Sequence, residues 1–178
     1  SYSSPVIEEP ISVWSKMLLI TGAMEGATVF VRSIGPNPRD VVKTTVGGGS
    51  DSVPLLPGVT LQANDRLVAR QQVGGDLSDW TPDKKATTVN DAPTLAELDA
   101  VTLRTDPWEC GQFVFVTGAV PGSKVELSIG GAPHGSGDAP LGAAQFTLTG
   151  KLSAPGPVRV RQLTPIGLGP AADLPVNP

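Results

Sequence analysis

The stretch "TGAMEGATVFV", Thr21 to Val31, decides the expected fold, because it returns ninety-six positions later as "TGAVPGSKVEL", Thr117 to Leu127. Both copies contain two glycines four positions apart, followed by alternating apolar residues. Glycine permits a tight backbone turn, and alternation with a period of two is typical of a strand with one buried face. We interpret each copy as a β-hairpin, with Val29 and Val31 facing a core and Phe30 on the opposite face. Because Phe30 is large and apolar, we expect something to cover it.

The composition favours many short strands. The 178 residues include 21 glycines and 18 prolines, with 4% aromatic and 17% charged residues. Such frequent turn residues leave little room for helices, so an all-β fold is expected. The net charge of -4 comes without a basic stripe, which argues against nucleic-acid binding. No apolar run approaches the roughly 20 residues that span a bilayer, so membrane insertion is not expected.

Alternating runs mark the predicted strands. In the first half they cover residues 16–23, 27–34 and 65–73, with weaker candidates at 40–46 and 58–63. In the second half they cover residues 112–119, 123–131, 143–150 and 157–164. The segments "GPNPRD", "GGGSDS" and "LPG" are predicted turns or loops.

The two halves align as a repeat. Glycines and valines of the opening phrase match at an offset of 96, while Arg70 matches Arg161 and Gln71 matches Gln162 at an offset of 91. We attribute the difference of five residues to a longer "GGGSDS" loop in the first copy. The sequence therefore predicts two antiparallel β-sandwich domains, residues 1–85 and 86–178, joined by a polar segment after Thr81.

The residues of the repeat resemble a known family. An early "G-x-x-x-G-x-x-V-x-V" is met by Gly22, Gly26, Val29 and Val31, and a late "L-x-x-G-x-x-V-x-A" by a run around Leu61, Leu67 and Ala69. This pattern resembles bacterial immunoglobulin-like (Big-type) modules of surface and secreted proteins. The resemblance implies two tandem immunoglobulin-like sandwiches at the cell surface or outside the cell.

The sequence offers little for catalysis or metal binding. Cys110 and His134 are the only cysteine and histidine, and nothing else supports a nucleophile and base pair, so we expect no enzyme and no catalytic residue. Asp51, Asp76 and Asp79 lie near glycines, but their spacing fits no calcium loop, and we interpret them as turn residues. No metal site is predicted, although calcium is the one cofactor left open.

The aromatic residues are the candidate binding residues. Trp14, Trp80, Trp108 and Phe30 could stack on sugars or anchor a protein partner. The alternative is that the tryptophans fill the ends of the sandwiches or the junction between modules, and we prefer this second interpretation.

The expected function is structural or adhesive. We expect a non-catalytic extracellular protein that acts as a spacer or as a subunit of a surface filament or lattice, with other protein chains, including copies of itself, as partners. The N-terminal tail "SPVIEEPISV" could donate a strand to a neighbouring chain. The alternatives are a carbohydrate-binding module or an accessory region of a larger secreted enzyme.

Overall fold

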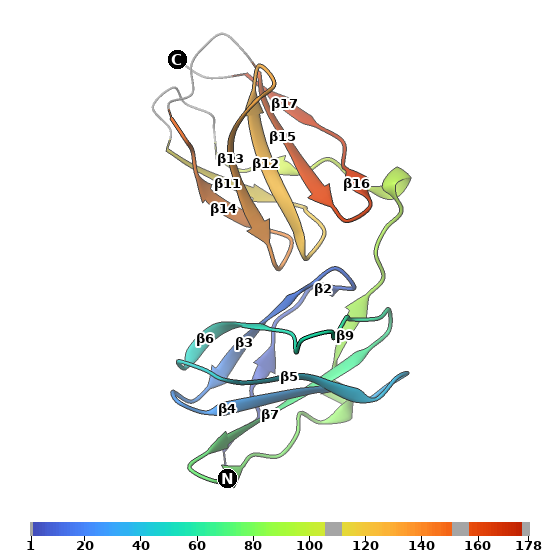
Figure 1. The fold of residues 1–178 in the computed structure, drawn as a ribbon, viewed down its shortest axis with the longest axis vertical. Coiled ribbons are helices and arrows are strands. Elements are labelled where there is room, and N and C mark those ends of the chain that lie inside the picture. Colours follow the sequence, from blue (N-terminus) through green and yellow to red (C-terminus); the bar gives the residue numbers. More distant parts are fainter. Residues whose placement is uncertain (1, 106–111, 151–156, 176–178) are drawn as a thin grey trace. The chain divides into compact units, whose positions relative to one another are not determined.

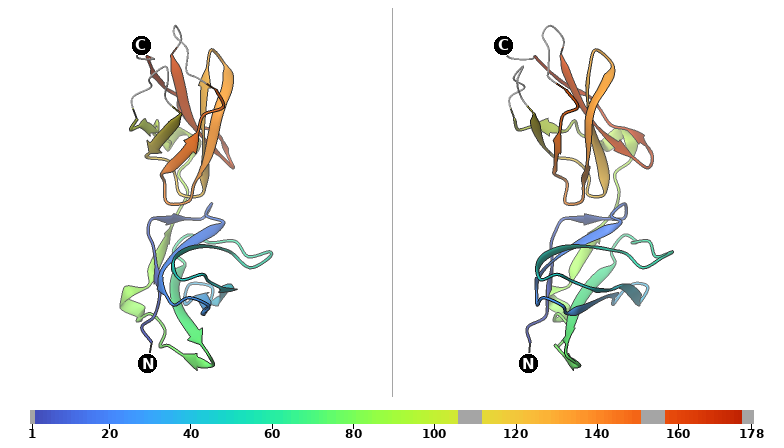
Figure 2. Two further views of the ribbon diagram at one scale, coloured as in Figure 1. Left: turned by 90° about the vertical axis from the view of Figure 1, so that its left-hand side faces the viewer. Right: turned by 60° about the vertical axis from the view of Figure 1, so that its left-hand side comes forward.

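The computed structural model describes residues 2–105, 112–150 and 157–175 of the chain, and it divides into two compact domains, Ser1–Ala92 and Pro93–Pro178 (Figure 1). Within the described residues there is no α-helix, and the only helical turns are two short 3-10 segments, η1 (Asp83–Lys85) and η2 (Leu95–Glu97). Figure 2 shows that each domain consists of two sheets packed face to face. The all-β class and the tandem immunoglobulin-like sandwiches predicted from the sequence are therefore confirmed.

The first domain pairs a three-stranded sheet with a six-stranded one. Its strands are β1 (Val6–Ile7), β2 (Ile11–Ser12), β3 (Met17–Ala23), β4 (Thr28–Ser33), β5 (Arg39–Thr45), β6 (Gly49–Pro54), β7 (Arg66–Val73), β8 (Asp76–Leu77) and β9 (Thr87–Asn90). The smaller sheet has the order β1-β3-β6, and the larger one β2-β9-β7-β4-β5 with β8 added beside β7. Among the strand pairs of the described residues, only β2–β9 is parallel.

The second domain repeats this plan. Its strands are β10 (Thr102–Leu103), β11 (Phe113–Thr117), β12 (Ser123–Ile129), β13 (Ala132–Ala139), β14 (Ala144–Thr147), β15 (Val158–Thr164), β16 (Gly167–Leu168) and β17 (Ala172–Leu174). One sheet has the order β10-β11-β14, and the other β13-β12-β15-β16, with β17 also paired to β15.

The repeat extends to the register of the strands. Phe30 lies opposite Arg70 in the β4–β7 pair, and Glu126 lies opposite Arg161 in the β12–β15 pair. These partners are offset by 96 and 91 positions, as the sequence alignment predicts. The two domains therefore share one backbone design, residue by residue, over these paired strands.

The opening phrase is not a hairpin, and this part of the interpretation was wrong. β3 pairs with β1 and β6, whereas β4 pairs with β5 and β7 in the other sheet. The short link between Ala23 and Thr28 therefore crosses from one sheet to the other. Gly22 and Gly26 have φ of 71° and 74°, in the left-handed region that glycine adopts most readily. Gly22 lies within β3 at a register shift rather than at its end.

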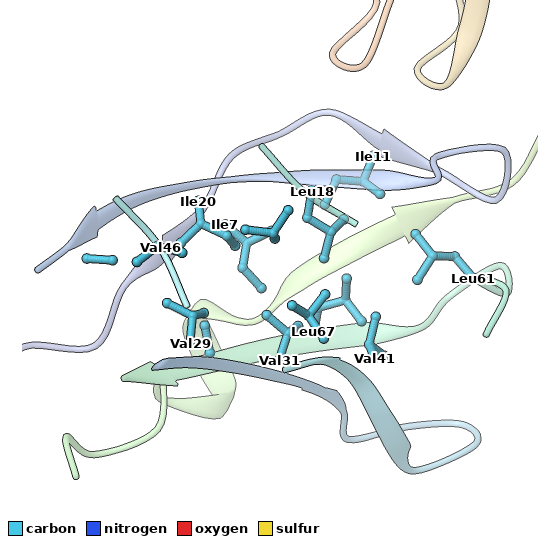
Figure 3. Packing of buried hydrophobic residues seen from close by; sticks show 14 of the residues in the cluster. Ile7, Ile11, Leu18, Ile20, Val29, Val31, Val41, Val46, Leu61 and Leu67 are labelled. Atoms are coloured by element: carbon cyan, nitrogen blue, oxygen red, sulfur yellow. The ribbon is translucent and has the colours of Figure 1, made fainter. Parts of the chain in front are cut away.

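The crossover explains the apolar alternation on both sides of it. Leu18 and Ile20 on β3 point toward Val29 and Val31 on β4, and all four are at most 1% exposed (Figure 3). A strand in each sheet thus supplies one wall of the same core, which excludes water from both. The predicted inward direction of Val29 and Val31 is confirmed.

The sequence prediction missed two of the longer strands, which are edge strands rich in glycine and polar residues, and the short strands β1, β2, β8, β9, β10, β16 and β17. β6 contains much of "GGGSDS", a predicted loop, and β13, "APHGSGDA", includes His134. In β13 a side chain at Gly137 would come within 2.8 Å of the Phe146 ring, so glycine leaves room for that ring. Conversely, residues 58–63 form no strand.

The length difference between the copies also lies elsewhere than predicted. The β4–β5 connection spans Ile34 to Pro38, whereas the β12–β13 connection is only Gly130 and Gly131. Three of the five extra residues therefore lie in this loop rather than in "GGGSDS".

The domain division falls after Ala92 rather than after residue 85, because β9 pairs with β7 and β2 of the first domain.

A buried glutamine joins three segments of the first domain. Gln71 on β7 is 1% exposed, and its Oε1 accepts a hydrogen bond from the Met24 backbone N–H at 2.8 Å. Its Nε2 donates to the carbonyl oxygen of Ser3 at 2.7 Å. One side chain therefore holds both the crossover between the sheets and the N-terminal segment against β7.

The second domain contains the same arrangement at matching positions. Gln162 on β15 is 1% exposed; it accepts from the Val120 N–H at 2.9 Å and donates to the Asp99 carbonyl at 3.0 Å. Val120 and Asp99 are the positions that correspond to Met24 and Ser3 at the offset of 96. We call each set of two hydrogen bonds the glutamine clamp.

A buried ion pair closes the other end of the first sandwich. The Asp65 side chain is fully buried and lies 2.5 Å from Arg39, with further hydrogen bonds from Ser33 Oγ and the Gln62 N–H. Burial alone would raise the pKa of Asp65, but the hydrogen bonds from Arg39, Gln62 and Ser33 and the charge of Arg39 together lower it. The ionised carboxylate therefore stabilises the folded domain.

Replacing either clamp glutamine should destabilise its own domain. In Gln71→Leu the Met24 N–H and the Ser3 carbonyl lose their partner, and we expect a loss of about 1–3 kcal/mol in unfolding free energy. Urea unfolding, with amide hydrogen exchange to separate the domains, measures it. Gln162→Leu should weaken only the second domain. Gln72→Leu is the matched control, because Gln72 donates only to Gly75 at 3.4 Å. Equal losses in Gln71→Leu and this control would contradict the role of the clamp.

The Asp65 pair should make the first domain sensitive to acid. Because the folded pKa is lowered, the contribution is complete above the unfolded value of about 3.9 and disappears as the pH falls below it through the folded pKa. Urea midpoints measured between about pH 2 and pH 7 should show this loss in the wild type and not in Asp65→Asn, which is less stable at neutral pH. Asp76→Asn, at an exposed carboxylate, should retain the wild-type profile. An unchanged acid profile in Asp65→Asn would refute this assignment.

Candidate functional site

The outer face of the larger sheet in the first domain gathers cations around aromatic rings. Phe30 lies at the middle of β4, directly opposite Lys43 on β5 and Arg70 on β7. The Lys43 Nζ lies 5.7 Å from the centre of the Phe30 ring, and the Arg70 Cζ lies 5.3 Å from it. Two cations from the flanking strands therefore provide the cover that we expect for this large apolar side chain on the outer face.

Trp80 extends this arrangement. The Arg70 Cζ lies 4.5 Å from the centre of the Trp80 ring, and the Arg32 Cζ lies 4.2 Å from it. Both distances are within the range at which a cation is attracted to the negative face of an aromatic ring. Lys43, Phe30, Arg70, Trp80 and Arg32 thus alternate between cation and ring, and we call this set the cation–aromatic ladder.

Backbone hydrogen bonds on both sides of Trp80 hold it over β7. Before it, the Ser78 N–H donates to the Gln71 carbonyl at 2.9 Å, and Ser78 Oγ accepts from the Gln71 N–H at 3.0 Å. After it, the Thr81 N–H donates to the Ala69 carbonyl at 2.8 Å. The segment that carries Trp80 therefore runs along β7 as an additional edge, which places the ring against Arg70.

The cations of the ladder have no carboxylate partner within 4.0 Å among the residues that the structure describes. Arg32 and Lys43 are exposed, while Arg70 is half-buried and its Nε has no hydrogen-bond partner in the described part of the chain. Val68, on the same face of β7, is only 1% exposed although it lies outside the inner core. The ladder is therefore a packed surface layer with free cationic groups.

The second domain uses the same positions differently. Glu126 stands where Phe30 stands, and its carboxylate lies 3.2 Å from Arg161, the counterpart of Arg70. Ser128 and Ser136 replace Arg32 and Lys43, and Ala171 replaces Trp80. The arginine is thus common to both domains, but in the second domain a carboxylate neutralises it.

Two of the four predicted site residues meet in the ladder. Phe30 and Trp80 are brought together through Arg70. Trp14 lies in the turn between β2 and β3, where its backbone N–H donates to Ser12 Oγ at 3.0 Å. Trp108 lies outside the described residues. Any binding role of these aromatic residues stays a prediction. A sugar that stacks on either ladder ring has to displace a cation already lying over it.

Arg32 and Lys43 were missed by sequence reasoning, and Arg70 was noted only as a repeated position. Arg32 follows Phe30 by two residues on one strand, so alternation alone places both on the outer face. The contacts with Lys43 and Trp80 depend on strand pairing, which the sequence of each strand does not contain.

The other candidate residues form no metal site in the part of the chain that the structure describes. Among residues 2–105, 112–150 and 157–175, no group of three or more His, Cys, Asp and Glu side chains is close enough to hold a metal ion. Asp51 instead accepts a hydrogen bond from the Gly48 N–H at 3.0 Å. Cys110 lies outside the described residues, so its pairing with His134 cannot be placed. No helix in the described part of the chain could cross a membrane.

An exposed aromatic pair in the second domain was also missed. Phe113 and Phe115 alternate with buried Val114 and Val116 on β11, and are 58% and 41% exposed. Their counterparts in the first domain are Met17, which is exposed, and Leu19, which is half-buried. These two outward positions of the strand are therefore apolar in both domains.

Comparisons with known proteins give structural likeness only. The sequence matches no family model and no curated protein. A solved structure described as the BSP domain of a biofilm-associated protein matches 97% of this chain and 29% of that chain, with 15% identity and a TM-score of 0.40. This chain therefore spans less than a third of that structure.

Two chicken structures with fibronectin type III domains also match. The FN1–FN3 domains of chicken CNTN1 match over 100% of this chain and 68% of that chain, with 11% identity and a TM-score of 0.36. A two-domain fibronectin type III segment of chicken tenascin matches over 99% and 100%, with 12% identity and a TM-score of 0.31. The immunoglobulin-like assignment rests on the sheet orders and registers of this chain.

The contact between Arg70 and Trp80 should appear as a coupling energy. We expect a double-mutant cycle of Arg70→Met and Trp80→Leu, measured by urea unfolding, to give about 0.5–1 kcal/mol. A control cycle pairs Trp80→Leu with Arg66→Met, because Arg66 on the same strand instead donates to the Asp83 carbonyl. A coupling energy no larger than that of the control would show that the stacked geometry contributes nothing.

Proposed function

We propose that this chain is a non-catalytic structural or adhesive part of an extracellular or cell-surface protein, in which the two immunoglobulin-like domains serve as a spacer or an assembly unit. The observation that carries the proposal is the repetition of one backbone design. Both domains use the same strand register and the same glutamine clamp, while their outer faces differ. Repetition of a stable module with changed surfaces is typical of proteins that extend or connect.

The N-terminal tail supports assembly through strand exchange. In this structure β1 pairs with β3 and β2 pairs with β9 of the same chain, and their side chains Ile7 and Ile11 are buried in the core. The tail therefore fills a site in its own domain. In an assembly, the tail of one copy would make these same contacts in the next copy, as in donor-strand complementation.

This proposal predicts that the tail can act in trans. A chain that begins at residue 13 should lose at least about 3 kcal/mol of first-domain stability, because two buried isoleucines are removed. Adding a synthetic peptide of residues 1–12 should restore the urea midpoint, and fluorescence anisotropy of the labelled peptide should report its binding.

A peptide carrying Ile7→Asp and Ile11→Asp is the matched control, because it keeps the length and removes the buried groups. Exchange is excluded as the assembly mode if the native peptide restores no more stability than this control. A truncated chain with an unchanged midpoint would show that the tail contributes nothing to the first domain.

A further inference from the structure

The cation–aromatic ladder presents its cations in an orientation suited to anions. A guanidinium group stacked on a ring uses its flat face for the ring and keeps its N–H groups at the edge, where they can donate two parallel hydrogen bonds to a carboxylate. Arg32 and Arg70 are both stacked on Trp80, so less side-chain freedom remains to be lost on binding. The ladder therefore provides cationic groups that are already positioned.

The second domain shows which group such an arginine accepts. Where Phe30 is replaced by Glu126, the carboxylate of this residue approaches Arg161 to 3.2 Å. Two further ion pairs, Lys124 with Asp138 and Arg159 with Asp173, lie on strands of the same sheet. The first domain lacks such pairs on its ladder. A carboxylate group of a ligand would therefore occupy, on the first domain, the position that the Glu126 carboxylate occupies on the second domain.

The position of the ladder favours a polysaccharide over a peptide. Lys43 lies on the edge strand β5, but a peptide added there would run along that strand, whereas the ladder crosses the strands. The other strands of the ladder, β4 and β7, lie inside the sheet and are paired on both sides, so they offer no row of free N–H or C=O groups. An extended peptide gains most of its affinity from such groups at a sheet edge. A sugar chain needs none of them, because its hydroxyl groups can remain hydrated while its carboxylates meet the cations.

A hollow beside the ladder provides room for a sugar ring. It has a volume of about 470 Å³ and is lined by Arg32, Ser33, Ile34, Pro38, Arg39 and Asp40. The β4–β5 connection that lines it is the one that is three residues longer than its counterpart in the second domain. Arg39 is engaged by buried Asp65, and Asp40 lies opposite Arg32 in register without an ion pair between them. Arg32 is thus the free cation at this end.

We propose that the ladder face of the first domain, Arg32, Lys43 and Arg70 spaced by Phe30 and Trp80, binds a linear polysaccharide that carries carboxylate groups. The cations pair with successive carboxylates, and the rings hold the cations in place instead of stacking on the sugar. This mode differs from sugar stacking on an exposed tryptophan. Binding should therefore depend on charge and weaken as salt is added.

The test uses the full chain and polygalacturonate as the probe, with dextran of similar length as the uncharged polymer. Titration calorimetry at about 50 mM salt should show binding to polygalacturonate only, weakened severalfold at about 0.5 M salt. The variant Arg32→Gln/Lys43→Gln should bind at least about tenfold more weakly, because two charge-assisted contacts are lost. Lys84→Gln/Lys85→Gln removes the same charge from exposed residues of η1 and should bind within about twofold of the wild type.

A second variant tests the ladder in another way. Phe30→Glu reproduces the pairing of the second domain, and the new carboxylate should neutralise Arg70 and abolish binding while the thermal midpoint shows a folded domain. No binding by the wild type, or equal losses in the ladder and η1 variants, would overturn the proposal. Equal or tighter binding of poly-L-glutamate would overturn the assignment to a polysaccharide and point to an acidic protein partner.

Discussion

The structure depends on one buried hydrogen-bonding side chain in each domain. A sandwich needs its two sheets held in a fixed relation, and apolar packing alone has little direction. Gln71 and Gln162 supply direction because each fixes two backbone groups from segments distant in sequence: the link that crosses between the sheets and the segment that precedes the first strand. Leaving these backbone groups buried without a partner costs more than an ordinary hydrogen bond contributes, so neither glutamine can be replaced freely by an apolar residue.

This internal constraint leaves the outer faces free to change. Phe30 and Glu126 occupy the same register position beside an arginine, yet one presents a ring and the other a carboxylate. Neither contributes to the inner core, so the exchange alters surface chemistry without altering the sheet. The first domain keeps its cations stacked and unpaired, whereas the second pairs its own with Glu126, Asp138 and Asp173. Functional difference between the domains is therefore expected on this face.

Features that depend on residue spacing along one strand could be predicted from the sequence, whereas features that depend on which strands pair could not. Alternation placed Val29, Val31 and Phe30 on the correct faces, and the matching positions of Gln71 and Gln162 are part of the repeat that the sequence predicts. The prediction of a hairpin was wrong because two consecutive strands have the same alternating sequence pattern whether they pair with each other or lie in different sheets. β6 and β13 were missed because edge strands have few buried positions and tolerate glycine. Phe30 and Trp80 were identified singly, fifty residues apart, and they are joined through Arg70 by the β4–β7 register and by the hydrogen bonds that hold the Trp80 segment on β7.

Two arginines of the first domain, Arg39 and Arg32, have different roles because their partners differ. The charge of Arg39 is neutralised by buried Asp65, whose two carboxylate oxygens accept hydrogen bonds from Nη1 and Nη2 of Arg39 and hold the end of the sandwich. Arg32, seven residues earlier on the adjacent strand, has a ring in place of a carboxylate and remains exposed. A ring attracts a cation without neutralising it, so the guanidinium keeps both its charge and its outward donors. Aromatic partners are therefore the means by which this sheet fixes cations in position and still leaves them able to bind an anion.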